Sequence, residues 1–160
     1  MKKSISLFSM MPLLLCGCLF TQSIKNGNFF EPAGTDVFIL NDIKTDTMSS
    51  FSMDMNEIKN SVVMICEQFD IHLTEKTGHS SDGAVFMDVY ISENQYMKKF
   101  TTFNSVTISF SFYKKDSSGQ LYLIGKTVYT EDTRETISSF KYFCRILTKT
   151  VEYTAEMLFN

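Results

Sequence analysis

The alternation of apolar and polar residues predicts extended strands in the first half and the middle of the chain. Every second side chain is apolar over residues 106–112, and a similar alternation runs over 85–92. A period of two is typical of a strand with one buried face. The brief apolar run at 37–40 predicts an earlier strand, because it is too short for a helix.

A hairpin is predicted around the turn residues Asp, Ser, Ser and Gly at 116–119. Residues 121–129 return as a β-rich run, so residues 105–130 are expected to form two antiparallel strands. The preceding segment, 93–104, either extends the neighbouring strands or forms a long connection, and the pattern leaves both possibilities open.

Spacings of three and four residues predict two helices. Asp54 and Glu57 have the spacing of a capping box, and an apolar stripe follows them: Met55, Ile58, Val62, Ile65, Phe69 and Leu73. A second stripe follows the polar residues 131–138: Phe140, Phe143, Leu147, Val151, Thr154 and Leu158. Each stripe is expected to face a sheet.

The expected fold class is α+β. The elements occur in the order strand, helix, strand, strand, strand, helix, which predicts a mostly antiparallel sheet of about four strands with both long helices on one face. The length suits one domain, which we expect over residues 36–160. Residues 18–35 show no strand or helix period and contain Asn, Gly and Pro, so they are expected to form a tether.

The first residues of the chain have the layout of an export signal. Lys2 and Lys3 precede an apolar run over residues 5–15. That run is shorter than the about 20 apolar residues that a membrane-spanning helix requires. A removable signal is therefore favoured over a permanent membrane span.

The end of this signal reads Leu15, Cys16, Gly17, Cys18 and resembles the lipobox of bacterial lipoproteins. In that family the Cys thiol is alkylated with diacylglycerol, and the peptide before it is removed. Gly17 fits the small residue required before the modified Cys, although Cys16 departs from the usual Ala, Ser or Thr. The resemblance implies a signal peptide over 1–17 and lipidation of Cys18. The alternatives are an uncleaved apolar helix or an ordinary signal peptide with incidental cysteines.

Net charge argues against a nucleic-acid partner. The whole chain carries −3, and removal of Lys2 and Lys3 with the signal makes the charge −5. The acidic residues are scattered, and no basic face that would meet phosphates is indicated.

Two cysteines, Cys66 and Cys144, remain in the predicted domain. An exported chain meets an oxidising compartment, so a disulfide between them is possible. Packing of two thiols on separate helices explains them equally well.

No catalytic, cofactor or metal site is predicted. His72 near the end of the first helix and His79 in a polar loop lack the company of a metal site or a nucleophilic triad. Ser, Ser, Asp and Gly follow His79 as ordinary loop residues. Four acidic residues are candidates for paired carboxylates but fall at element ends, where solvated side chains are expected: Glu93, Glu131, Asp132 and Glu135.

The order of elements resembles the small α+β domains of envelope lipoproteins, such as the lipopolysaccharide-transport lipoprotein of the outer membrane and the auxiliary lipoproteins of ABC-type transporters. The resemblance implies a non-catalytic accessory, assembly or transport-associated component of the cell envelope. The favoured location is the periplasmic face of the outer membrane. A surface-exposed lipoprotein facing a host or the medium is the alternative, and an enzyme is a third hypothesis.

The expected partners are the membrane, through the N-terminal lipid, and an envelope protein or a lipid-like ligand between sheet and helices. Apolar side chains on the second faces of the strands offer a contact surface, unless the tether or a partner helix covers them. They are Phe86, Tyr90, Tyr122, Ile124 and Val128.

Overall fold

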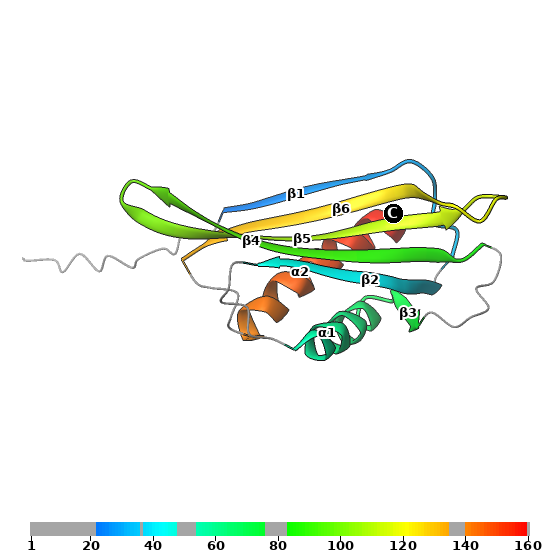
Figure 1. Cartoon of the computed structure of the whole chain (residues 1–160), viewed down its shortest axis with the longest axis horizontal. Coiled ribbons are helices and arrows are strands. Elements are labelled where there is room, and N and C mark those ends of the chain that lie inside the picture. The colour runs from blue at the N-terminus through cyan, green and yellow to red at the C-terminus, as the bar shows by residue number, and fades with distance from the viewer. Residues whose placement is uncertain (1–21, 36, 48–53, 76–82, 135–139, 160) are drawn as a thin grey trace, which may run out of the picture.

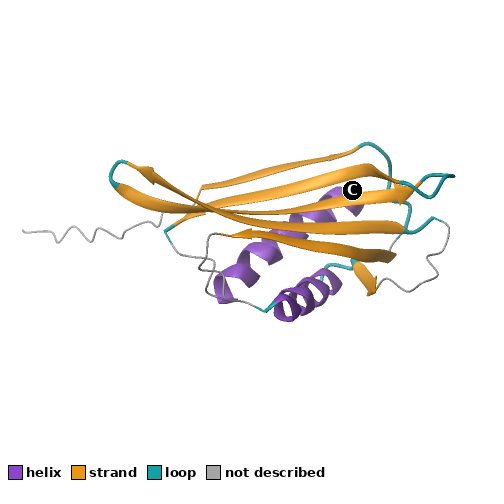
Figure 2. Ribbon diagram, in the orientation of Figure 1, coloured by secondary structure: helices purple, strands orange, loops and turns teal. Residues whose placement is uncertain are grey.

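Six strands and two helices form the part of the chain that the computed structural model describes, residues 22–35, 37–47, 54–75, 83–134 and 140–159. They are β1 (Gln22–Phe29), β2 (Val37–Thr47), α1 (Met55–Glu67), β3 (His72–Glu75), β4 (Val85–Lys98), β5 (Thr101–Lys115), β6 (Leu121–Thr133) and α2 (Phe140–Phe159). The strands make one curved sheet in the order β1-β6-β5-β4-β2-β3. Both helices lie on the same side of it (Figures 1 and 2).

The prediction of about four mostly antiparallel strands is wrong, because the sheet has six strands. The sheet is mixed: β2 pairs in parallel with β3 and with β4, and the other pairs are antiparallel. The order also differs, because β1 precedes β2 and β3 follows α1. Parallel pairing of β2 and β3 is the ordinary result of a helical crossover between two strands of one sheet.

Residues 22–29, which the sequence pattern assigns to a tether, form the edge strand β1. Most of its side chains are exposed or half-buried, so the strand needs no alternation of apolar residues to find its place. The backbone of β6 fixes it instead, from Gln22 opposite Asp132 to Phe29 opposite Gly125.

The two helices lie where the apolar stripes place them. The Asp54 carboxylate accepts a hydrogen bond of 3.0 Å from the Asn56 N–H, which caps α1. α1 ends before the stripe does, because the backbone at Asp70 takes a left-handed conformation and His72 begins β3. Residues 93–104 extend β4 and β5, which pair from Phe86 opposite Tyr113 to Lys98 opposite Thr101.

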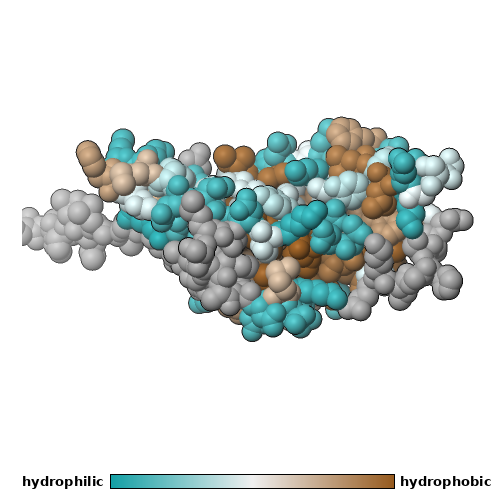
Figure 3. Space-filling view, in the orientation of Figure 1, coloured by the Kyte–Doolittle hydropathy of each residue, from teal (hydrophilic) through white to brown (hydrophobic). Residues whose placement is uncertain are grey.

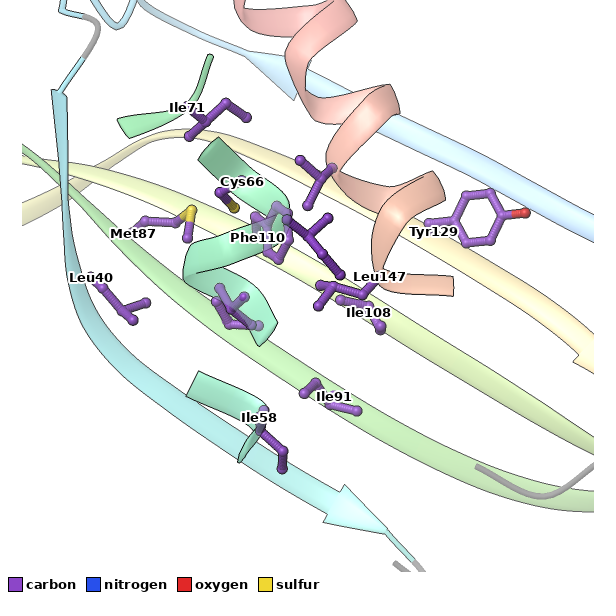
Figure 4. Packing of buried hydrophobic residues seen from close by; sticks show 14 of the residues in the cluster. Leu40, Ile58, Cys66, Ile71, Met87, Ile91, Ile108, Phe110, Tyr129 and Leu147 are labelled. Carbon is purple, nitrogen blue, oxygen red and sulfur yellow. The ribbon is translucent and has the colours of Figure 1, made fainter. Parts of the chain in front are cut away.

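The core lies between the sheet and the two helices (Figure 4). Strands β4 and β5 supply its centre, and α1 and α2 close it from one side. Each large apolar side chain buried there contributes about 1.5–3 kcal/mol. Its fully buried members include Val89, Ile91, Ile108, Phe110, Phe112, Ile58, Val62, Phe143, Leu147 and Val151.

The contact surface expected on the second strand faces is only partly exposed. Phe86 is buried, and the Lys115 ammonium lies 5.0 Å from its ring centroid. Ile124 belongs to the core. Tyr90 and Tyr122 are exposed, so the apolar surface is smaller than the sequence predicts.

Phe29 fastens the end of β1 to the sheet. Its ring lies against Gly125 of β6, and its centroid is 5.3 Å from that of Phe112. A Cβ atom at position 125 would overlap with the Phe29 ring. An aromatic ring that covers a strand glycine in this way supplies the contacts that the glycine cannot make.

We expect Gly125→Ala to displace Phe29 and to loosen β1, at a cost of about 1–3 kcal/mol for overpacking. Hydrogen exchange would report this as faster exchange of β1 amides while the amides of β4 and β5 stay protected. In a Phe29→Ala background the same substitution should cost little. Equal costs in the two backgrounds would contradict the packing argument.

Candidate functional site

One end of the sheet carries a projecting hairpin, and β1 begins at that same end (Figure 1). Gln22, Asp132, Ser105 and Asn94 are successive partners across β1, β6, β5 and β4, so they form one row. Residues 95–103 of β4 and β5 continue past this row, and we name them the tip hairpin. The start of β1, the first strand in the described part of the chain, therefore lies at the base of the tip hairpin.

The turn of the tip hairpin has an unusual composition. Lys98 pairs with Thr101, which leaves Lys99 and Phe100 as a two-residue loop. Both have positive φ, 47° and 64°, as a type I′ turn requires. Asn-Gly or Gly-Gly adopts this turn easily, whereas a left-handed backbone costs other residues about 1–2 kcal/mol each. Lys and Phe are therefore unfavourable residues for the two central positions of this turn.

The tip hairpin exposes large apolar side chains beside cations. Phe100 is 100% exposed and Met97 is 72% exposed. Lys98 and Lys99, which are also exposed, lie between them in the chain. Figure 3 shows apolar and hydrophilic side chains together on this projection. The tip is therefore amphipathic and points away from the core.

Aromatic contacts stiffen the base of the tip hairpin. Tyr96 and Phe103 stack with their centroids 5.8 Å apart, and the Arg134 guanidinium lies 5.6 Å from the Phe103 ring. A hydrogen bond from Tyr96 to Asp132, together with burial, raises the pKa of the Tyr96 hydroxyl. These contacts hold the two strands of the hairpin in one orientation.

A hollow of about 350 Å³ lies along this base. It is lined by Tyr96, Lys98, Lys99, Thr101, Phe103, Asp132 and Arg134. Three of these side chains are cationic and one is anionic, so the hollow carries a positive excess in an otherwise acidic protein. Such a lining suits an anionic group of small size.

A buried charge cluster lies between β6 and α2, on the helix-covered face of the sheet. The Glu131 side chain is 0% exposed. Arg145 Nη2 is 2.8 Å from Glu131 Oε1, and Lys149 Nζ is 3.1 Å from Oε2. The Tyr129 hydroxyl donates to Oε2 at 3.1 Å. All four residues hold β6 against α2.

The environment of the cluster shifts the pKa of its donors. Burial alone would lower the pKa of Lys149, but hydrogen bonding and attraction to Glu131 outweigh it, so the pKa is raised. Burial raises the pKa of the Tyr129 hydroxyl. Lys149 is therefore held charged, and Glu131 is fixed between two cations in the manner of a structural ion pair.

The expectation that the four acidic candidates are solvated is wrong for two of them. Glu93 and Glu131 are buried, and both flank Val106 in one row of the sheet. Asp132 is half-buried on the opposite face, whereas Glu135 lies outside the described residues. Arg145 and Lys149, which sequence reasoning missed, are one helical turn apart on α2, and this spacing is the signal that could have paired them with a carboxylate.

Both domain cysteines are free thiols. No bond joins Cys66 to Cys144, although α1 and α2 pack together. Burial raises the pKa of Cys66 to about 12 and also raises that of the half-buried Cys144. A thiol with so high a pKa is a poor nucleophile, so packing explains Cys66.

Cys18 and His79 lie outside the described residues, and His72 is exposed at the start of β3 instead of ending α1. Within the described ranges, no three His, Cys, Asp or Glu side chains gather as metal ligands would. Within the described residues, no helix is both long enough and apolar enough to cross a membrane.

No protein-family model and no curated protein matches this sequence. Solved structures do match the fold. PelC from Paraburkholderia phytofirmans, described as a dodecamer, aligns with a TM-score of 0.52 at 8% identity over 82% of this chain and 97% of PelC. A second PelC dodecamer, of a single-residue variant, gives 0.51 at 9% identity over 82% of this chain and 96% of its own.

The chain shares the fold of PelC. A minor lipoprotein from Acinetobacter baumannii also aligns, with a TM-score of 0.41 at 8% identity, over 76% of this chain and 92% of its own. Identities this low describe the architecture and leave activity to the residues of the site.

Proposed function

We propose that this protein is a lipid-anchored, non-catalytic accessory component of a bacterial cell envelope, held to its membrane by acyl chains on Cys18. The favoured location is the periplasmic face of the outer membrane, with an envelope protein or a lipid-like ligand as partner. One observation carries the proposal: the lipobox-like sequence that ends at Cys18 stands directly before the first strand of the sheet, which begins at Gln22.

The short connection supports an anchored role. Cys18 is four residues before Gln22, so covalent geometry allows the two Cα atoms to be at most about 14 Å apart. A lipid on Cys18 would therefore keep the end of the sheet that carries the tip hairpin close to the bilayer. A domain attached in this way presents a fixed end to its membrane and the rest of its surface to partners.

The best candidates for chemistry in the domain support an accessory role. Glu131 is held by two cations and a tyrosine, and Cys66 has a thiol pKa of about 12. A catalytic base needs a free lone pair near the substrate, and a nucleophilic thiol needs a lowered pKa. Both side chains instead stabilise the packing of helices on the sheet.

We expect wild type, expressed with its own signal in a bacterial host, to gain the mass of two or three acyl chains and to partition into detergent. Cys18→Ser should lose both properties, because each buried methylene is worth about 0.8 kcal/mol and Cys16, which follows the bulky Leu15, does not fit the place of the acceptor. Intact-mass spectrometry and detergent partitioning measure the outcome.

The matched control is Cys16→Ser, which changes the neighbouring thiol and leaves Gly17 before the acceptor. It should be lipidated like wild type. An unlipidated wild-type product, or acyl chains that persist in Cys18→Ser, would overturn the proposal. Protease added to intact cells then tests the location: a periplasmic protein is protected, and a surface-exposed one is cut.

A further inference from the structure

We propose that the tip hairpin, residues 95–103, inserts its turn into the surface of the bilayer that holds Cys18. Met97 and Phe100 would enter the boundary between headgroups and acyl chains, while Lys98 and Lys99 would lie at the level of the phosphates. The inference rests on the proposed function, since the lipid on Cys18 brings the hairpin to the membrane.

The length of the tip hairpin is within the span that the connection to Cys18 allows. From the row that contains Gln22 and Asn94, β4 continues for four residues to Lys98, which adds about 14 Å at the rise of an extended strand. Cys18 lies four residues before Gln22 and so reaches at most about 14 Å from the same row. A fully extended connection directed along the strands would bring Cys18 to the depth of the tip.

The side chains at the tip suit an interface between water and lipid. Segments that lie at the membrane surface combine apolar or aromatic residues with Lys or Arg, and long cationic side chains extend from the apolar layer to the headgroups. Met97 and Phe100 are largely exposed and are adjacent to Lys98 and Lys99 in the chain. Exposed apolar side chains on a projection, beside cations, mark a contact surface.

The hollow at the base adds charge complementarity. Arg134 joins Lys98 and Lys99 around it, against the single carboxylate of Asp132. Basic residues near a bilayer surface are attracted to anionic lipids. The chain as a whole carries a net charge of −3, so the positive excess around the hollow is opposite in sign and would favour the approach of this end to an anionic membrane.

The backbone of the turn gives an independent reason. Lys99 and Phe100 both have left-handed φ values, which Asn and Gly would adopt at lower cost. A local conformational cost that the fold retains is a mark of a functional position. Insertion into a membrane requires an apolar side chain at the outermost position, and Gly could not supply it.

The test uses the absence of tryptophan from the sequence, so that Phe100→Trp creates a single-tryptophan protein. Full-length protein, with two or three acyl chains confirmed by intact mass, is reconstituted into vesicles of phosphatidylcholine and phosphatidylglycerol. Each protein is measured in two sets of vesicles, and in one set the phosphatidylcholine is brominated on its acyl chains. We expect bromine to remove about half of the tryptophan emission of Phe100→Trp, because interfacial side chains lie about 5–10 Å into the headgroup and acyl boundary.

Leu121→Trp is the matched control, because Leu121 is exposed on β6 at the opposite end of the sheet. Its emission should be unaffected by bromine. Met97→Trp is a second probe within the tip hairpin and should be quenched like Phe100→Trp. Equal quenching at positions 100 and 121, or none at positions 97 and 100, would overturn the inference.

Two further outcomes separate this inference from the proposed function. A lipidated Phe100→Trp protein whose emission stays unquenched overturns the insertion and leaves the lipid anchor intact. A tryptophan at position 100 that is shielded from water in vesicles and yet unaffected by bromine shows that a protein surface covers the hairpin, and this also overturns insertion. Loss of the acyl chains themselves is detected beforehand by mass and contradicts the proposed function instead.

Discussion

Replacing Arg145 and Lys149 together with Met should destabilise the domain by about 3–5 kcal/mol, the cost of leaving a buried charge without its partners. Glu131 is 0% exposed, so its carboxylate would lose both cationic partners at a buried position. The cations differ in this respect, since their side chains are 47% and 44% exposed. Urea unfolding followed by circular dichroism measures the loss.

The decisive comparison adds Glu131→Gln to the double variant. Gln keeps the shape of Glu and removes the charge, so the triple variant should recover most of the lost stability. Glu131→Gln alone should cost less than the double variant, because Arg145 and Lys149 can turn towards solvent. A triple variant no more stable than the double one would mean that lost packing, and not the buried charge, dominates.

Phe110→Ala should cost about 3–5 kcal/mol, the usual range for truncation of a buried phenylalanine. Phe110 is fully buried at the centre of β5, beneath the two helices (Figure 4). The lost contacts and the remaining cavity both contribute to the cost. The midpoint of urea unfolding should fall while its slope stays the same.

Phe100→Ala is the matched control, because the same side chain is fully exposed in the turn of the tip hairpin. Its effect on stability should stay within about 0.5 kcal/mol. Comparable losses at positions 100 and 110 would contradict the burial assigned to them. A neutral Phe100→Ala would also show that the bromine experiment can alter this position without disturbing the fold.

The sequence predicted the strands and helices in which buried side chains recur at the regular spacing of a strand or a helix. In β5, Ile108 and Phe110 alternate with serines, and the alternation identified both the strand and its buried face. Asp54 marked the start of α1 because a capping side chain is a local signal. Both kinds of signal lie within a few residues and need no knowledge of the tertiary structure.

Elements that depend on distant neighbours were missed. β1 is exposed along most of its length and becomes a strand only because β6 pairs with it. β3 has four residues, too few for a period to emerge. Parallel pairing of β2 and β4 likewise has no local signature, because it depends on where the chain returns after α1 and β3.

The buried charge cluster was missed for a related reason. In β6 the residues that face the helices include Thr127, Glu131 and Thr133, while the apolar Val128 is only half-buried. Hydropathy along this strand therefore points to the wrong face. The positions of Arg145 and Lys149 on α2 compensate the burial of Glu131, and those positions depend on tertiary packing.

The pairing of β1 with β6 has a consequence for the order of folding. Among the described strands, β1 is the first to be synthesised, and its sheet neighbour, β6, is the last. Pairing over so long a stretch of chain is slow compared with the β4–β5 and β5–β6 hairpins, which close locally. A chain that stopped before β6 would therefore leave β1 without a strand to pair with and β5 as an open edge of the sheet.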